Sequence, residues 1–152
     1  MKTKVLFTVL LIATIFISCK KNNDEPETTS ITPVEIAKNH FMNNHVGPSN
    51  LVIYNQTEWN DFLTQIENSI NVNYVFGQAN IDFQNEMVIA VIDSVYPTGG
   101  WSVDITNITE NPNDIEVLYT NLETGDDTMI IIEPFHVVKI PRSNKPFVFT
   151  KY

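Results

Sequence analysis

The chain has 152 residues, with 18 acidic and 9 basic side chains and a formal net charge of −9. An acidic surface argues against nucleic acid as a partner, and against docking on anionic lipid through basic residues. The length that remains after a leader and a linker corresponds to one domain, large enough for a single packed core.

The first 18 residues are expected to be a signal peptide that is not part of the fold. Lys2 and Lys4 form a positive start, and the apolar run that follows is shorter than a membrane span. The run ends at Cys19, in a sequence that resembles a bacterial lipobox, although Phe16 stands where Leu is usual. We therefore expect lipidation of Cys19 and a lipid-anchored protein of the cell envelope, at the outer membrane, with periplasmic or surface orientation left open.

Residues 19–31 are expected to form a disordered acidic tether. Residues 20–30 include no apolar side chain, so this segment cannot bury enough surface to offset its chain entropy. Residues 32–152 are then the single domain. Because Cys19 is the only Cys, the domain has no intrachain disulfide and depends on its core for stability.

Two helices are expected in the first half of the domain. Thr32, Pro33 and Glu35 form a helix-start signal that predicts a helix over residues 33–42. A second helix is predicted over residues 58–69 with Thr57 as N-cap, after a short strand at 51–54. Its apolar stripe is interpreted as core packing against a sheet, and consists of Trp59, Phe62, Leu63, Ile66 and Ile70.

The rest of the chain is expected to be β, organised around a hairpin at residues 87–108. An all-apolar run predicts a strand buried on both faces, and an alternating run from Trp101 predicts a half-buried one. Further strands are predicted at 114–120, 128–140 and 147–152, where Pro134 marks a bulge, an edge or a crossing to another sheet. The fold class is α+β, mainly β: a compact antiparallel sheet or sandwich with two short N-terminal helices packed on it.

The turn between the two hairpin strands is the candidate binding loop. This PTGGW loop consists of Pro97, Thr98, Gly99, Gly100 and Trp101. In one interpretation the glycines only close the turn and Trp101 is the first core residue of its strand. In the other the loop contacts a partner, with Trp101 as the anchor. Both interpretations stay open.

No catalytic or metal-binding constellation is expected. His136 is the best candidate base, but no nucleophile-elbow motif accompanies Ser94, Ser102 or Ser143, so a structural histidine is favoured. His40 and His45 lack a zinc-site pattern. The acidic turn at residues 123–127 lacks the regular oxygen spacing of a calcium loop. We expect a protein that is not an enzyme and has no cofactor or metal.

Four segments, in order, resemble the C-terminal domain family of PrcB, the lipoprotein subunit of a bacterial surface protease complex. They are Ile81-Asp82-Phe83, the run 86–91, the PTGGWS turn, and PFHVVKIP at 134–141. The likeness spans roughly residues 50–149, with Trp101 and Phe135 where the family more often has Tyr. It implies a non-catalytic module that binds or stabilises a partner protein, a protease.

Two alternatives to a stabilising subunit remain. The PTGGW loop also looks like the P-T-T-G-Y loop of chagasin-type cysteine-protease inhibitors, which implies inhibition through the loop. A third alternative is an envelope module that binds a small molecule or glycan through an aromatic surface.

Overall fold

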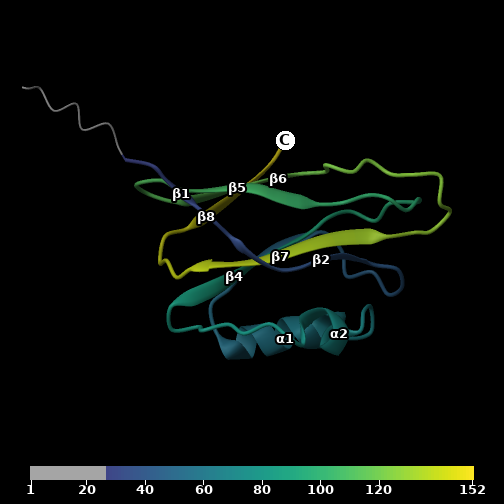
Figure 1. Ribbon diagram of the computed structural model, residues 1–152, viewed down its shortest axis with the longest axis horizontal. Coiled ribbons are helices and arrows are strands. Elements are labelled where there is room, and N and C mark those ends of the chain that lie inside the picture. Colours follow the sequence, from purple (N-terminus) through teal and green to yellow (C-terminus); the bar gives the residue numbers. More distant parts are fainter. Residues whose placement is uncertain (1–26) are drawn as a thin grey trace, which may run out of the picture.

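The computed structural model describes residues 27–152, so the expected signal peptide, the lipidation site Cys19 and tether residues 19–26 lie outside the described residues. The fold has three layers (Figure 1): a layer of helices, a central sheet and an outer sheet. The expected α+β, mainly β class is confirmed, and of the sheet and the sandwich the structure has the sandwich, with two four-stranded sheets. Among the described residues, no helix is long and apolar enough to cross a membrane.

Each of the two sheets combines strands from distant parts of the chain. The outer sheet has the order β1-β5-β6-β8, and consists of β1 (Thr29–Ile31), β5 (Asp104–Glu110), β6 (Ile115–Thr120) and β8 (Phe147–Lys151). The central sheet has the order β2-β7-β4-β3, and consists of β2 (Val34–Phe41), β7 (Glu133–Pro141), β4 (Glu86–Ile92) and β3 (Ser49–Ile53). All pairs are antiparallel except β6 with β8.

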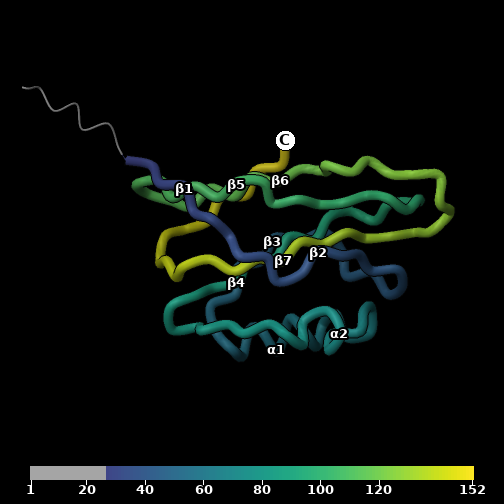
Figure 2. The backbone as a smooth tube through the Cα atoms, in the orientation of Figure 1, coloured from purple at the N-terminus to yellow at the C-terminus, as the bar shows by residue number. Residues whose placement is uncertain are grey.

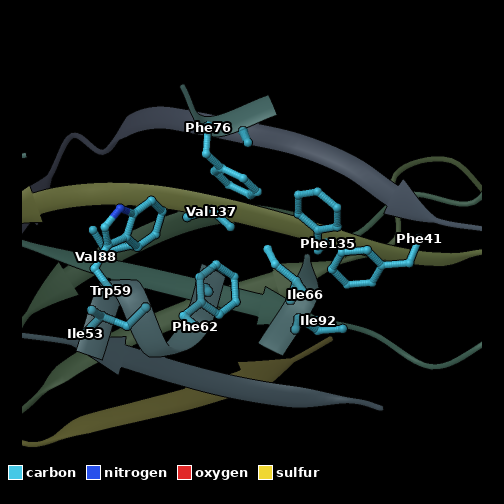
Figure 3. Close-up of a cluster of buried hydrophobic side chains, with 12 residues drawn as sticks. Phe41, Ile53, Trp59, Phe62, Ile66, Phe76, Val88, Ile92, Phe135 and Val137 are labelled. Carbon is cyan, nitrogen blue, oxygen red and sulfur yellow. The ribbon is translucent and has the colours of Figure 1, made fainter. Parts of the chain in front are cut away.

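The central sheet is buried on both faces. Val88, Ala90 and Ile92 of β4 face the helices, whereas its Met87, Ile89 and Val91 face the outer sheet. The helix-side cluster contains stacked aromatic rings (Figure 3): those of Phe41 and Phe135 lie 4.6 Å apart between centroids. The expectation of a strand buried on both faces is confirmed.

The expected hairpin at residues 87–108 is wrong. β4 pairs with β3 and β7 in the central sheet, whereas β5 pairs with β1 and β6 in the outer sheet. Residues 93–103 therefore cross from one sheet to the other, as the backbone trace shows (Figure 2). The chain does bend at residues 97–99, and Gly100 has a positive φ. A turn does not by itself specify which strands pair. The true hairpin joins β5 to β6 through the Asn111–Asp114 turn, where the Asn111 N–H donates to the Asp114 carbonyl at 2.9 Å.

The helix expected at residues 33–42 is also wrong, because this segment is strand β2. It pairs with β7 from Val34 to Phe41, with a bulge between Glu35 and Ala37. The capping signals concern only a few local hydrogen bonds, and several residues of this segment have modest helix propensity: Val34, Ile36, Asn39 and His40. The ladder of hydrogen bonds with β7 therefore decides the conformation.

The helices that do form are α1 (Gln56–Ile66) and α2 (Val72–Phe76). The apolar stripe of α1 is buried as expected at Trp59, Phe62 and Ile66. The helix begins earlier than expected, since Asn55 rather than Thr57 is the N-cap and accepts from the Glu58 N–H at 3.0 Å. The sequence analysis did not predict α2, a helix of only five residues.

Two boundaries differ from expectation. Residues 29–31, assigned to the tether, form β1 and pair with β5. In the run 128–140 only β7 is a strand of the sheet, and Pro134 lies near its start, where the chain has just crossed from the outer sheet to the central one. Of the three interpretations of Pro134, the crossing is right. The strands expected at 51–54, 114–120 and 147–152 are confirmed as β3, β6 and β8.

Candidate functional site

The long connections 93–103 and 121–132, between the two sheets, lie together at one end of the molecule, which we call the loop end. β4 and β6 run toward this end, and β5 and β7 run away from it (Figure 1). β1 starts at the opposite end. The loop end is therefore the part of the domain farthest from the point where the chain enters it.

The PTGGW loop is held by backbone hydrogen bonds to the second connection. The Gly99 N–H donates to the Thr128 carbonyl at 2.9 Å, and the Gly99 carbonyl accepts from the Asp126 N–H at 2.9 Å. The Gly100 carbonyl accepts from the Gly125 N–H at 3.1 Å. Gly100 and Gly125 have φ of +71° and +91°, a conformation that favours glycine. The loop is thus a braced turn with a defined backbone.

Trp101 is half-buried and belongs to neither of the two hydrophobic clusters. One face of its indole stacks on Tyr96, with 4.1 Å between ring centroids and 10° between the planes. Its Nε1–H donates to Oγ1 of Thr98 at 3.1 Å. Trp101 is therefore not a core residue of a strand, and part of its surface remains free for contact.

Beside Trp101 lies a shallow depression of about 260 Å³. It is formed where β2 passes the connection that leads into β5. The lining residues are Lys38, Asn39, His40, Trp101, Ser102, Val103 and Glu123. Its lining is mainly polar, so it is suited to a polar or charged group rather than to an apolar ligand.

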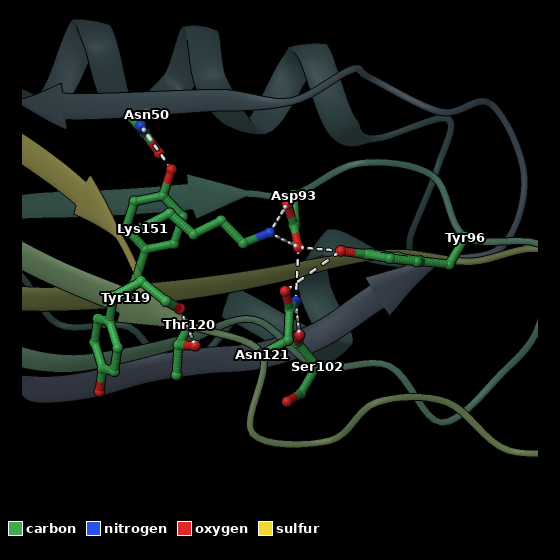
Figure 4. A network of polar contacts seen from close by, with 9 residues as sticks. Asn50, Asp93, Tyr96, Ser102, Tyr119, Thr120, Asn121 and Lys151 are labelled. Atoms are coloured by element: carbon green, nitrogen blue, oxygen red, sulfur yellow. Dashed lines mark hydrogen bonds and ion pairs between the residues drawn. The ribbon is translucent and has the colours of Figure 1, made fainter.

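A buried carboxylate, Asp93, ties the base of the loop end to the C-terminal strand (Figure 4). It accepts from Tyr96 Oη at 2.7 Å, from Asn121 Nδ2 at 2.7 Å and from Lys151 Nζ at 2.8 Å. Desolvation by itself would raise the pKa of Asp93, but the hydrogen bonds from Asn121, Lys151 and Tyr96 hold that pKa below its ordinary value. Because its carboxylate is engaged by three side chains of the domain itself, Asp93 holds the loop in place and is not a free acid.

A second buried carboxylate, Asp104, stands at the start of β5. It accepts from Ser102 Oγ and from the Leu122 N–H, and it forms an ion pair with Lys38 of β2. Burial acts to raise the pKa of Asp104, and the bonds from Lys38, Ser102 and Leu122 more than offset this, so that the pKa is lowered. This ion pair joins the edge strand of the central sheet to the outer sheet.

His136 lies on β7 between the sheets. Its Nδ1 accepts from the Ile105 N–H at 2.9 Å, which assigns the proton of the neutral ring to Nε2. Nε2 lies 3.2 Å from Oε2 of Glu35 but out of line for a hydrogen bond. Burial lowers the pKa of His136, although the nearby Glu35 carboxylate acts to raise it.

The geometry of His136 agrees with the structural role that was expected for it. Of the three candidate nucleophiles, Ser102 is buried and its Oγ is engaged with Asp104 and with the Glu123 N–H. Within the described residues, neither Ser94 nor Ser143 is hydrogen-bonded to His136. The three serines and the histidine therefore form no nucleophile–base pair in this part of the chain.

Residues 27–152 contain no group of three or more His, Cys, Asp or Glu side chains that could hold a metal ion. His45 lies 3.8 Å from the buried Glu133, whose carboxylate accepts from the N–H groups of Val46 and Gly47 at 2.7 and 2.8 Å. This carboxylate anchors the loop between β2 and β3. In the acidic turn, Asp126 Oδ1 caps the Thr128 N–H at 2.8 Å.

Sequence reasoning missed the three buried acids, Asp93, Asp104 and Glu133. Each of them has a partner far away in the chain: Lys151 is 58 residues from Asp93, Lys38 pairs with Asp104 across the sheets, and Val46 is 87 residues from Glu133. Two local signals were present: Asp93 directly follows an apolar run, and Glu133 directly follows another and precedes Pro134.

The fold and the loop end define a helix-covered β-sandwich with a braced loop. No family model, no curated protein and no solved structure matches the chain.

Proposed function

We propose that the chain is a non-catalytic module of the cell envelope that binds or stabilises a partner protein through its loop end. The observation that carries this proposal is the PTGGW loop: its backbone is bonded to the facing connection, and Trp101 is left half-exposed beside a depression. A loop that is already ordered loses little conformational entropy on binding. The resemblance to the PrcB family suggests a protease as the partner.

The position of the loop end supports a tethered module. A lipid on Cys19 would hold the domain from the side where β1 starts, because β1 is the first described element. The loop end lies on the opposite side of the domain (Figure 1). It would therefore point away from the membrane and toward other proteins of the envelope.

The packing of the loop favours docking on a surface over insertion into a protease cleft. Gly99 is buried, and a Cβ at this position would lie 3.2 Å from both Asp126 and Thr128. The facing connection thus backs the loop along its length. A loop that inserts into a protease cleft would need both of its sides exposed, so inhibition is the less favoured function.

The test is purification of the full chain from membranes of the native cells. Wild-type protein is compared with a Thr98→Ala/Trp101→Ala variant and with a control, Thr64→Ala/Tyr74→Ala, in which a Thr and an exposed aromatic residue are changed on the helix layer. We expect wild type and control to recover one protein in stoichiometric amount, and the loop variant to lose it. Recovery of no stoichiometric partner by wild type would contradict the proposal.

A protease assay separates stabilisation from inhibition. If the recovered partner is a protease, added wild-type domain should leave its initial rate unchanged and lengthen its lifetime on incubation. Inhibition by wild type that is absent in the Thr98→Ala/Trp101→Ala variant would instead establish the inhibitor function.

A further inference from the structure

The loop end has an apolar patch that the sequence analysis did not single out. It consists of Val95, Met129, Ile130 and Ile131, whose exposed fractions are 43, 98, 42 and 54%. These are four of the ten large hydrophobic side chains that are exposed among the described residues. Single exposed apolar residues are ordinary, but a cluster at one site is typical of an interaction surface.

The exposure of this patch follows from the pairing of the two connections. Tyr96 and Ile132 form an antiparallel bridge with N–H to carbonyl distances of 2.7 and 3.0 Å. Since side chains alternate along extended chain, Val95 and Ile131 share the face opposite to Tyr96 and Ile132. Ile132 is buried with 1% exposure, so the pairing that buries it turns its neighbour Ile131 outward. Val95 and Ile131 are therefore directed outward beside the buried Ile132.

The charged side chains of the two connections are all acidic. The connections 93–103 and 121–132 contain no Lys or Arg, whereas Glu123, Asp126 and Asp127 are exposed there. The nearby cations Lys38 and Lys151 are paired with Asp104 and Asp93. An apolar centre with an acidic border is complementary to an apolar surface bordered by basic side chains.

We infer that the loop end binds a protein surface with an apolar centre and a basic rim, and that the apolar patch makes the central contact. This inference rests on the proposed binding function and names the chemistry of the partner. Two other occupants are disfavoured by the same charges: a second copy of the chain would bring acid against acid, and an anionic bilayer would repel the acidic border.

The experiment selects peptides from a random library displayed on phage, with the wild-type domain as bait. Selected peptides are then measured against Met129→Ser/Ile131→Ser and against a control, Tyr74→Ser/Val148→Ser, which removes two exposed apolar side chains elsewhere. Far-UV circular dichroism and thermal melting confirm that each variant is folded. We expect enriched peptides that combine bulky apolar residues with Lys or Arg, bind wild type and control equally, and bind the patch variant at least tenfold more weakly.

Several results would overturn the inference. They are peptides that bind the patch variant as well as wild type, peptides rich in Asp and Glu, or no enrichment at all. Binding of wild type to vesicles of phosphatidylcholine and phosphatidylglycerol that is lost in the patch variant would identify a membrane as the occupant. A partner recovered from native membranes that is lost with Thr98→Ala/Trp101→Ala but kept by Met129→Ser/Ile131→Ser would leave the proposed function standing and refute this inference alone.

Discussion

His136 connects the two sheets through a single hydrogen bond from the Ile105 N–H. β5 has a bulge between Ile105 and Asn107, and the Ile105 N–H is directed to the imidazole Nδ1 of the central sheet. If Nδ1 carried a proton, it could no longer accept the hydrogen bond from the Ile105 N–H. The ring must therefore stay neutral for the contact to persist, and its burial favours the neutral form.

We predict that replacing His136 by Phe destabilises the domain at pH 7.5 by about 1–3 kcal/mol, because a buried N–H loses its acceptor. The measurement is the free energy of unfolding from urea titrations. Phe keeps an aromatic ring between the sheets but is larger than His, so the measured loss combines the lost hydrogen bond with the repacking around the ring. An unchanged free energy would mean that the Ile105 N–H finds another acceptor.

The burial of His136 also predicts that the free energy of unfolding depends on pH. The folded-state pKa of His136 lies below its ordinary value of 6.5, so the unfolded chain takes up the proton first. The contribution of His136 is complete above about pH 6.5 and is lost as the pH falls toward the folded-state pKa. The facing charges are Glu35 and Asp104, which raise the pKa, and Lys38, which lowers it.

Between pH 7.5 and 5, wild type should lose more unfolding free energy than His136→Phe, so that the gap between the two proteins narrows. Equal losses in the two proteins would show that other groups cause the acid sensitivity.

At the scale of elements, the loop end depends on two short segments that brace each other. A Cβ on Gly125 would lie 2.5 Å from Nε1 of Trp101, in addition to the strain of φ +91°. Gly47 has a similar φ of +94° but nothing within 4 Å of its Cβ position. The two positions therefore separate backbone strain from contact with Trp101.

We predict that Gly125→Ala costs more stability than Gly47→Ala, which should cost about 1 kcal/mol or more through backbone strain alone. Gly125→Ala should also shift the Trp101 fluorescence, measured in a Trp59→Phe background, since Trp59 and Trp101 are the only tryptophans. Equal costs and an unshifted spectrum would contradict the close packing of Trp101 on Gly125.

β2 can be tested through its last residue. Phe41 has 0% exposure and stacks on Phe135, whereas Met42 directly after the strand is 52% exposed. Phe41→Ala should cost about 3–5 kcal/mol of unfolding free energy, and Met42→Ala should stay within about 0.5 kcal/mol of wild type. Similar effects at both positions would mean that this segment does not alternate as a strand.

At the scale of the whole molecule, the central sheet couples the other two layers. Alternate residues of β4 belong to the helix-side cluster and to the cluster between the sheets. Loss of either layer would expose one face of the same strands. The domain should therefore unfold as one cooperative unit.

The two tryptophans report on different layers: Trp59 on the helices and Trp101 on the loop end. In a Trp59→Phe variant and in a Trp101→Phe variant, the urea transition seen by the remaining Trp should coincide with that seen by far-UV circular dichroism. A Trp59 transition at lower urea than the circular dichroism transition would mean that the helix layer melts separately.

The amino-acid sequence by itself determined which segments are apolar on which side, and hence most of the strands. The uninterrupted apolar run of β4 and the alternation of β6 are properties of the side chains, whatever the strands pair with. The stripe of α1 and the positive φ of Gly100 are likewise local, since they depend on helical periodicity and on the absence of a Cβ.

The tertiary structure alone decided how these segments are combined. Whether residues 34–41 form a helix or a strand depends on the ladder with β7, about a hundred positions away. The partners of β4 and β5 lie in different sheets, so the turn between them became a crossing. Local signals involve one or two hydrogen bonds, whereas a sheet adds a bond at every second residue and buries whole faces, so non-local pairing decided both cases.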